Sequence, residues 1–113
     1  MDLASAWFRK AGYDVEDVHS GRPYDLLCTK GSEVKYVEVK GTLSGGKRVI
    51  LTAGEVSFIG GNKPRCRLCV VHDIKITKGR KPKASGGRIS PDIPFDLSAG
   101  MLSPINYLYT RPS

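Results

Sequence analysis

Apolar positions recur along this chain at two different spacings, and the two spacings predict two kinds of element. Near the N-terminus, Leu3, Ala6 and Trp7 share one stripe of a helix, whereas later runs alternate residue by residue as strands do. Read in order, the pattern first predicts a helix at 2–12, three strands at 13–19, 24–30 and 33–40, and a short strand at 48–51. A second helix at 53–60, a long strand at 67–76 and a last strand at 105–109 follow. A mixed central sheet flanked by helices follows, in the α/β (α+β) class.

Local signals fix some of the boundaries between these elements. Gly31 and Ser32 supply turn chemistry between two strand-like runs, which predicts a hairpin. Thr52 and Glu55 have the spacing of a capping box at the start of the second helix. Residues at about 77–94 are rich in Gly, Pro, Ser and Lys, so we expect them to form a flexible basic loop.

Composition adds a domain count and a class of partner. A length of 113 residues is that of one domain, and a net charge of +7 favours a polyanionic partner such as nucleic acid. The positive charge gathers in one stretch, whose cations are Lys75, Lys78, Arg80, Lys81, Lys83 and Arg88. This stretch either follows a nucleic-acid backbone or is an ordinary solvated loop, and the sequence favours neither reading.

Cysteine usage and hydropathy bear on location. Three cysteines, an odd number, argue against a disulfide framework, and reduced thiols indicate a cytoplasmic protein. No apolar run approaches membrane-spanning length, so we expect no membrane partner.

Three polar residues in the first half of the chain suggest chemistry. Glu38 and Lys40 are two apart on a predicted strand and so point to the same face, and Asp25 can join them if its strand pairs in the hairpin. Two carboxylates beside an ammonium suit a divalent metal ion and the water that it activates. The competing interpretation is an amphipathic strand whose Glu38 and Lys40 are simply solvated.

Asp25 followed by Glu38-x-Lys40, in this order of helices and strands, resembles the PD-(D/E)xK nuclease superfamily with its restriction-endonuclease-like core. The runs 22–27 and 37–42, followed by 51–56, are closer still to the NO VEIN C-terminal-like subgroup, and the resemblance covers roughly residues 2–76. It implies a core of order α-β-β-β-α-β plus a C-terminal strand.

The resemblance also implies roles for particular residues. Asp25, Glu38 and the backbone carbonyl of Val39 would hold Mg²⁺ or Mn²⁺, and Lys40 would orient the attacking water or stabilise negative charge. The superfamily often carries a further acid on the first helix, where this chain offers only Asp2.

Other residues are candidates for supporting roles. Glu55 either supports the site or only caps its helix, with capping favoured, and His19 is expected near the mouth of the site as a structural residue or a phosphate contact. The expected contacts to nucleic acid are Lys47, Arg48, Lys78, Arg80, Lys81, Lys83 and Arg88.

The sequence therefore predicts a metal-dependent endonuclease domain acting on nucleic acid, with DNA as the expected substrate, in a restriction, repair or defence protein. A homodimer or fusion to a larger protein stays open, since cutting both strands of a duplex usually needs two sites. Two alternatives remain: a non-catalytic nucleic-acid-binding domain of the same fold, and a protein-interaction module that uses the edge at Tyr107–Tyr109.

Overall fold

The computed structural model contains two helices and seven strands within the residues that it describes. The described residues are 2–18, 22–42, 45, 48–76, 79–81, 84–95, 97, 100, 102–105 and 109–112. The elements are α1 (Asp2–Lys10), β1 (Asp14–Asp17), β2 (Leu26–Lys30), β3 (Glu33–Gly41), α2 (Ala53–Gly61), β4 (Cys66–His72), β5 (Lys75–Ile76), β6 (Ala84–Ser85) and β7 (Arg88–Pro94).

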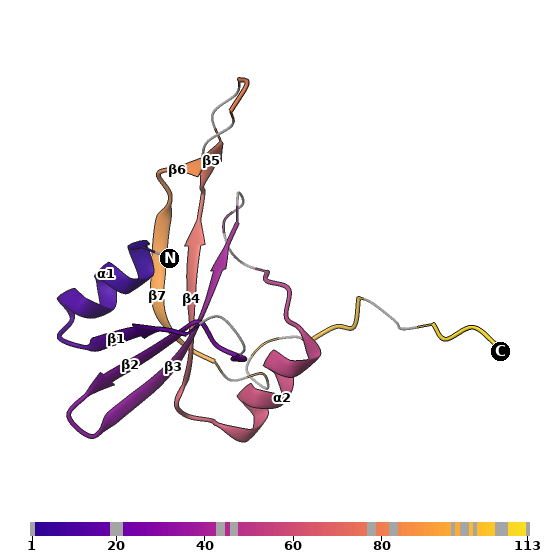
Figure 1. Ribbon diagram of the computed structural model, residues 1–113, viewed down its shortest axis with the longest axis horizontal. Coiled ribbons are helices and arrows are strands. Elements are labelled where there is room, and N and C mark those ends of the chain that lie inside the picture. Colours follow the sequence, from indigo (N-terminus) through magenta and orange to yellow (C-terminus); the bar gives the residue numbers. More distant parts are fainter. Residues whose placement is uncertain are drawn as a thin grey trace.

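Five of the strands form one mixed sheet, in the order β1-β2-β3-β4-β7. β1, β2 and β3 are antiparallel neighbours, and β3 pairs with β4 in parallel through the crossover that contains α2. β7 then returns antiparallel to β4 at the far edge (Figure 1). The predicted order α-β-β-β-α-β in a mixed sheet with helices is confirmed.

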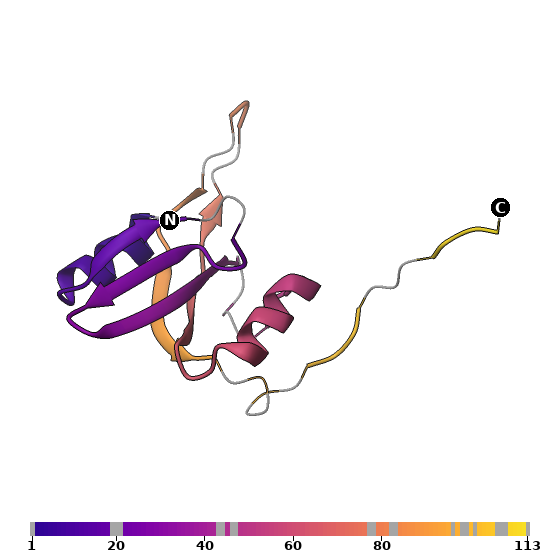
Figure 2. The ribbon, with the colours of Figure 1, turned by 60° about the horizontal axis from the view of Figure 1, so that its bottom comes forward.

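The two helices lie on opposite faces of this sheet, as the views in Figures 1 and 2 illustrate. On one face, Ala4 and Phe8 of α1 pack with buried residues of β2, β3 and β4, which are Leu26, Cys28, Val37 and Cys69. On the other face, Phe58 of α2 contacts the ring of Tyr36, with 5.2 Å between ring centroids. Because Tyr36 and Val37 are consecutive in β3, their side chains point to opposite faces.

The helical stripe predicted for α1 has the wrong phase. Leu3 is 47% exposed and Trp7 is 36% exposed, whereas Ala4 and Phe8 are fully buried. The buried stripe of the helix is therefore shifted by one residue from the predicted one. Within it, Phe8 makes edge-to-face contacts with Trp7 and Tyr13, at 5.0 and 5.7 Å between ring centroids. The choice between two adjacent apolar stripes depends on contacts with the sheet, which local periodicity does not encode.

The region after β4 differs most from expectation. The predicted strand 67–76 is two strands, β4 and β5, separated at Asp73, whose φ is 55°. The predicted flexible loop contains β6 and the whole of β7, so the loop prediction was wrong for residues 88–94. β7 was not predicted, because the last strand was expected at residues 105–109.

Two other strands were predicted, at residues 48–51 and 105–109. Residues 48–51 have no strand structure, so the short strand expected there was wrong. Ile105 and Tyr109 are outside any strand, and residues 106–108 lie beyond the described part of the chain. No helix in the described residues is long and apolar enough to span a membrane.

Candidate active site

Asp25 is held at the start of β2 by hydrogen bonds to β3. Its amide donates to the carbonyl of Val37 at 2.9 Å, and its carboxylate oxygen Oδ2 accepts from the amide of Val39 at 2.8 Å. The hairpin predicted from Gly31 and Ser32 is present, with Leu26 opposite Val37. It brings Asp25 to the middle of β3, where Glu38 lies.

Glu38 and Lys40 point to the same face of β3, as their spacing predicts. This is the face that Tyr36 shares, toward α2. The side chain of Glu38 is only 8% exposed, and its Oε1 lies 3.5 Å from Nζ of Lys40. Glu38 is therefore not a solvated strand residue, and the competing interpretation of an ordinary exposed face fails for it.

Glu55 joins this group from the first turn of α2. The predicted capping box is present: the amide of Glu55 donates to Oγ1 of Thr52 at 3.1 Å, and Oε1 of Glu55 accepts from the amide of Thr52 at 2.8 Å. The same Oε1 lies 3.1 Å from Nζ of Lys40. The capping role of Glu55 is therefore confirmed, and the same carboxylate also contacts Lys40, while its support of a catalytic site stays a prediction.

We call Asp25, Glu38, Glu55 and Lys40 the carboxylate cluster. Burial, and then hydrogen bonding to the carboxylates of Asp25 and Glu55, raises the pKa of Glu38 to about 9. Oε2 of Glu38 is buried, and no hydrogen bond to this oxygen is seen. Burial alone would raise the pKa of Glu55, but the Thr52 amide, Glu38 and Lys40 together hold it below its ordinary value.

The cluster has the donor chemistry of a divalent cation site. Carboxylate oxygens are the ligands that Mg²⁺ and Mn²⁺ take, and the unpaired Oε2 of Glu38 offers one that is not already used. In the geometry seen here, no three His, Cys, Asp or Glu side chains among the described residues are spaced to hold a metal ion. The role predicted for the Val39 carbonyl stays a prediction.

The other predicted side chains are exposed or lie outside the described chain. Arg48 is exposed on the segment before α2, and Arg80, Lys81 and Arg88 are exposed after β5. His19, Lys47, Lys78 and Lys83 lie outside the described residues.

A second charged group, which we did not predict, lies on the α1 face of the sheet. Lys35 is buried, and its Nζ lies 2.6 Å from Oδ2 of Asp92 in β7. Although burial alone would lower the pKa of Lys35, hydrogen bonding to Asp92 and Tyr13 raises it. The strand alternation gave a signal for this burial, because Lys35 has the parity of Val37, which is in the core.

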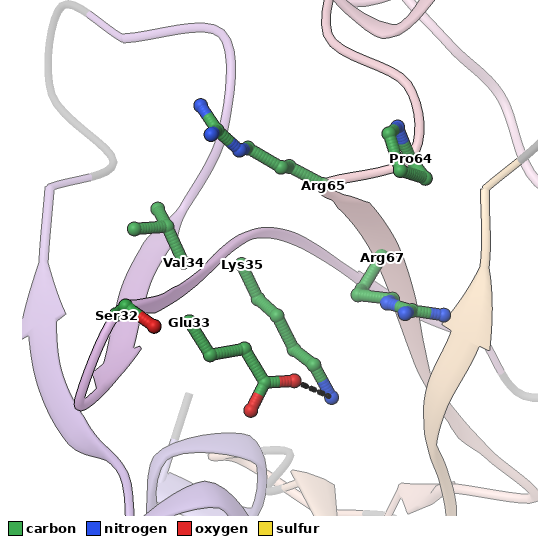
Figure 3. A pocket seen from close by; sticks show the side chains of 7 residues that line it. All are labelled: Ser32, Glu33, Val34, Lys35, Pro64, Arg65 and Arg67. Carbon is green, nitrogen blue, oxygen red and sulfur yellow. Dashed lines mark ion pairs between the residues drawn. The ribbon is translucent and has the colours of Figure 1, made fainter.

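A shallow pocket of about 250 Å³ opens beside Lys35, at the hairpin end of the sheet. Figure 3 shows Glu33 and Lys35 directed toward each other, while Arg65 and Arg67 point away from one another. Nε of Arg67 lies 3.5 Å from Oδ1 of Asp92. The pocket contains no member of the carboxylate cluster, and its ion pairs join β3 and β4 to β7.

The sequence of the chain matches one known protein family. The profile of the family described as Protein NO VEIN, C-terminal, matches residues 1–85. The chain belongs to the NO VEIN C-terminal family. The whole carboxylate cluster falls within the match, whereas β7 of this NO VEIN C-terminal domain lies beyond it. No curated protein matches the chain, and no solved structure matches it.

Proposed function

We propose that this NO VEIN C-terminal domain is a metal-dependent nuclease of the PD-(D/E)xK type, which hydrolyses phosphodiester bonds of nucleic acid and has DNA as its expected substrate. One observation carries the proposal: Lys40 lies 3.5 Å from Glu38 and 3.1 Å from Glu55, on the face of β3 where Asp25 is also held. The spacing that suggested a site is therefore accompanied by contact between the side chains.

Asp25 and Glu38, with the backbone carbonyl of Val39, would hold Mg²⁺ or Mn²⁺. When bound, such an ion lowers the pKa of a coordinated water and polarises a phosphoryl oxygen. A cation held by Asp25 and Glu38 would favour the ionised form of Glu38, and so would oppose the effect that burial has on the pKa of this carboxyl in the free protein.

Lys40 would donate hydrogen bonds to the attacking water and to the oxygen on which negative charge develops. Glu55 has no need to contact the substrate. Its carboxylate is fixed by the Thr52 amide at 2.8 Å and in turn fixes Nζ of Lys40 at 3.1 Å, so it is a positioning residue. A preorganised ammonium stabilises developing charge without reorganising during the reaction.

The electrostatics of the cluster support a functional interpretation. A carboxyl whose pKa is raised to about 9 is ionised only at a cost in stability, and strongly perturbed groups of this kind gather at functional sites. The net charge of +7 supports a polyanionic substrate. Free thiols at Cys28, Cys66 and Cys69 support a cytoplasmic location, and the family description as a C-terminal domain supports a place in a larger protein.

A second candidate function is nucleic-acid binding without cleavage. The exposed cations Arg80, Lys81 and Arg88 favour it, because they could bind phosphates whether or not the cluster is active. The two functions make different predictions for metal dependence. A nuclease needs the divalent ion, whereas phosphate binding by these cations does not.

Nicking of supercoiled plasmid distinguishes the two. The protein is incubated with plasmid in Mg²⁺, in Mn²⁺ and in EDTA, beside Asp25→Asn, Lys40→Gln and the exposed control Glu16→Gln. We expect nicking in either metal ion, none in EDTA, none with the two cluster variants, and wild-type rates with the control. Plasmid that is shifted in a gel but never nicked, with every metal ion, would favour the binding domain.

A further inference from the structure

A two-stranded ribbon extends beyond the end of the main sheet, and we call it the basic arm (residues 75–85). β5 pairs antiparallel with β6 at its base, with Lys75 opposite Ser85, and both views show β5 and β6 beyond the end of the main sheet (Figures 1 and 2). From residue 75 to residue 85 the sequence contains five Lys or Arg residues and no Asp or Glu. The arm is therefore a cationic projection with no internal charge compensation.

The base of the arm lies at the same end of the sheet as the carboxylate cluster. β3 and β4 are parallel, with Lys40 opposite Val70, so both strands advance toward the arm. The amide of Ile74, immediately before the arm, donates to the carbonyl of Thr42 at 3.3 Å. Thr42 is two residues past Lys40, which places the base of the arm about 7 Å beyond Lys40 along the strand.

The width of the β5–β6 ribbon matches one groove of duplex DNA and not the other. Two paired strands with their side chains are about 10 Å wide. The major groove of B-form DNA is about 12 Å wide and 8.5 Å deep, whereas the minor groove is about 6 Å wide. A-form RNA has a deep and narrow major groove, and a single strand has no groove at all.

We propose that the basic arm enters the major groove of B-form duplex DNA, with Arg80 and Lys81 contacting its phosphates, while the carboxylate cluster lies against the backbone that flanks this groove. The inference deepens the proposed function and rests on it for the choice of nucleic acid as the partner. It adds a substrate class, duplex DNA, and a separate surface that holds it. Both cations are exposed, so phosphate contact requires no rearrangement of the core.

The first test measures binding in EDTA, where cleavage plays no part. Fluorescence anisotropy gives the Kd of a 30-base-pair duplex for the wild type, for the double variant Arg80→Ala/Lys81→Ala and for the matched control Arg9→Ala/Lys10→Ala, which removes two exposed charges from α1. We expect the arm variant to bind on the order of tenfold more weakly, and its salt dependence to fall by about two phosphate contacts. The control should keep the wild-type Kd and slope. An equal loss in both variants would overturn the arm as a specific surface.

The second test blocks one groove at a time. The wild type is titrated with a duplex whose major groove carries glucosylated 5-hydroxymethylcytosine, and with an unmodified duplex whose minor groove is filled by netropsin. We expect at least tenfold weaker binding to the glucosylated duplex and less than twofold change with netropsin. The reverse pattern, or binding to single-stranded DNA as tight as to the duplex, would overturn major-groove entry.

These measurements separate the arm from the nuclease. Groove-dependent binding by a protein that never nicks DNA would retain the arm and overturn the proposed function. Metal-dependent nicking by the Arg80→Ala/Lys81→Ala variant at the wild-type rate and Kd would retain the proposed nuclease and overturn the arm as its DNA-binding surface.

Discussion

Replacing Glu38 by glutamine should stabilise the domain at neutral pH, although it removes a central residue of the proposed site. The unfolded chain ionises Glu38 near its ordinary pKa of 4.5, whereas burial among Asp25 and Glu55 raises the pKa to about 9 in the folded state. Between these values the folded protein binds one proton more than the unfolded chain. Stability from this group is therefore complete below pH 4.5 and is lost as the pH rises toward 9.

The magnitude follows from the linkage relation. One bound proton changes the free energy of unfolding by about 1.4 kcal/mol per pH unit, so the wild type should lose about 2–3 kcal/mol between pH 5.5 and pH 7.5 through Glu38. Glutamine cannot ionise, and its amide can donate to the same carboxylates as the protonated acid does. Glu38→Gln should therefore match the wild type near pH 5 and exceed its stability by about 1–3 kcal/mol at pH 7.5.

Urea unfolding at five pH values between 5 and 8, in EDTA, measures this difference. Glu16→Gln makes the same chemical change at an exposed position of β1 and serves as the control, with a pH profile parallel to that of the wild type. Parallel profiles for Glu38→Gln and the wild type would show that Glu38 is ionised in the folded protein. That result would refute the raised pKa of Glu38 in the carboxylate cluster.

Three further predictions concern the surroundings of the cluster. Thr52→Ala removes the Thr52 side chain from the capping box and should lower the free energy of unfolding in urea by about 1 kcal/mol. Thr52→Ser keeps a capping hydroxyl and should cost less than half of that, so equal losses would contradict the capping role. Asp92→Ala should cost about 2–3 kcal/mol, because the buried Lys35 ammonium loses its partner at 2.6 Å and keeps the longer contact to Glu33 at 3.8 Å. Lys35→Met in the same chain should recover most of the loss in urea unfolding, and additive losses would contradict this explanation. Burial raises the pKa of Cys28 to about 12 and of Cys69 to about 11. Mass spectrometry should therefore find these two thiols unmodified by iodoacetamide at pH 8 until urea unfolds the chain. Rapid labelling of the folded protein would contradict their burial.

Local chemistry in the sequence was enough to predict the part of the fold that carries the site. Gly31 and Ser32 set the hairpin, strand parity put Glu38 and Lys40 on one face, and Thr52 with Glu55 set the start of α2. Each signal acts within a few residues, so no tertiary information was needed. The contact between Lys40 and Glu55 was beyond such reasoning, because it depends on where α2 crosses the sheet.

β7 could not be recognised for a physical reason. It contains Pro91 and Pro94, which lack backbone donors and so disguise a strand as a loop in the sequence. An edge strand tolerates proline because one side of its backbone has no partner strand, and β7 is at the edge of this sheet. The ion pair between Lys35 and Asp92, which are 57 residues apart, could not be predicted either, because Asp92 lies in β7.

The most direct test of the proposed nuclease site combines activity with stability in one variant. The nicking rate of supercoiled plasmid is measured in Mn²⁺ for the wild type and for Glu38→Gln, at a pH where urea unfolding shows the variant to be at least as stable. A nuclease site at Asp25, Glu38 and Lys40 predicts metal-dependent nicking by the wild type and none by the stabilised variant. Equal nicking by the two proteins, or nicking that persists in EDTA, would contradict it.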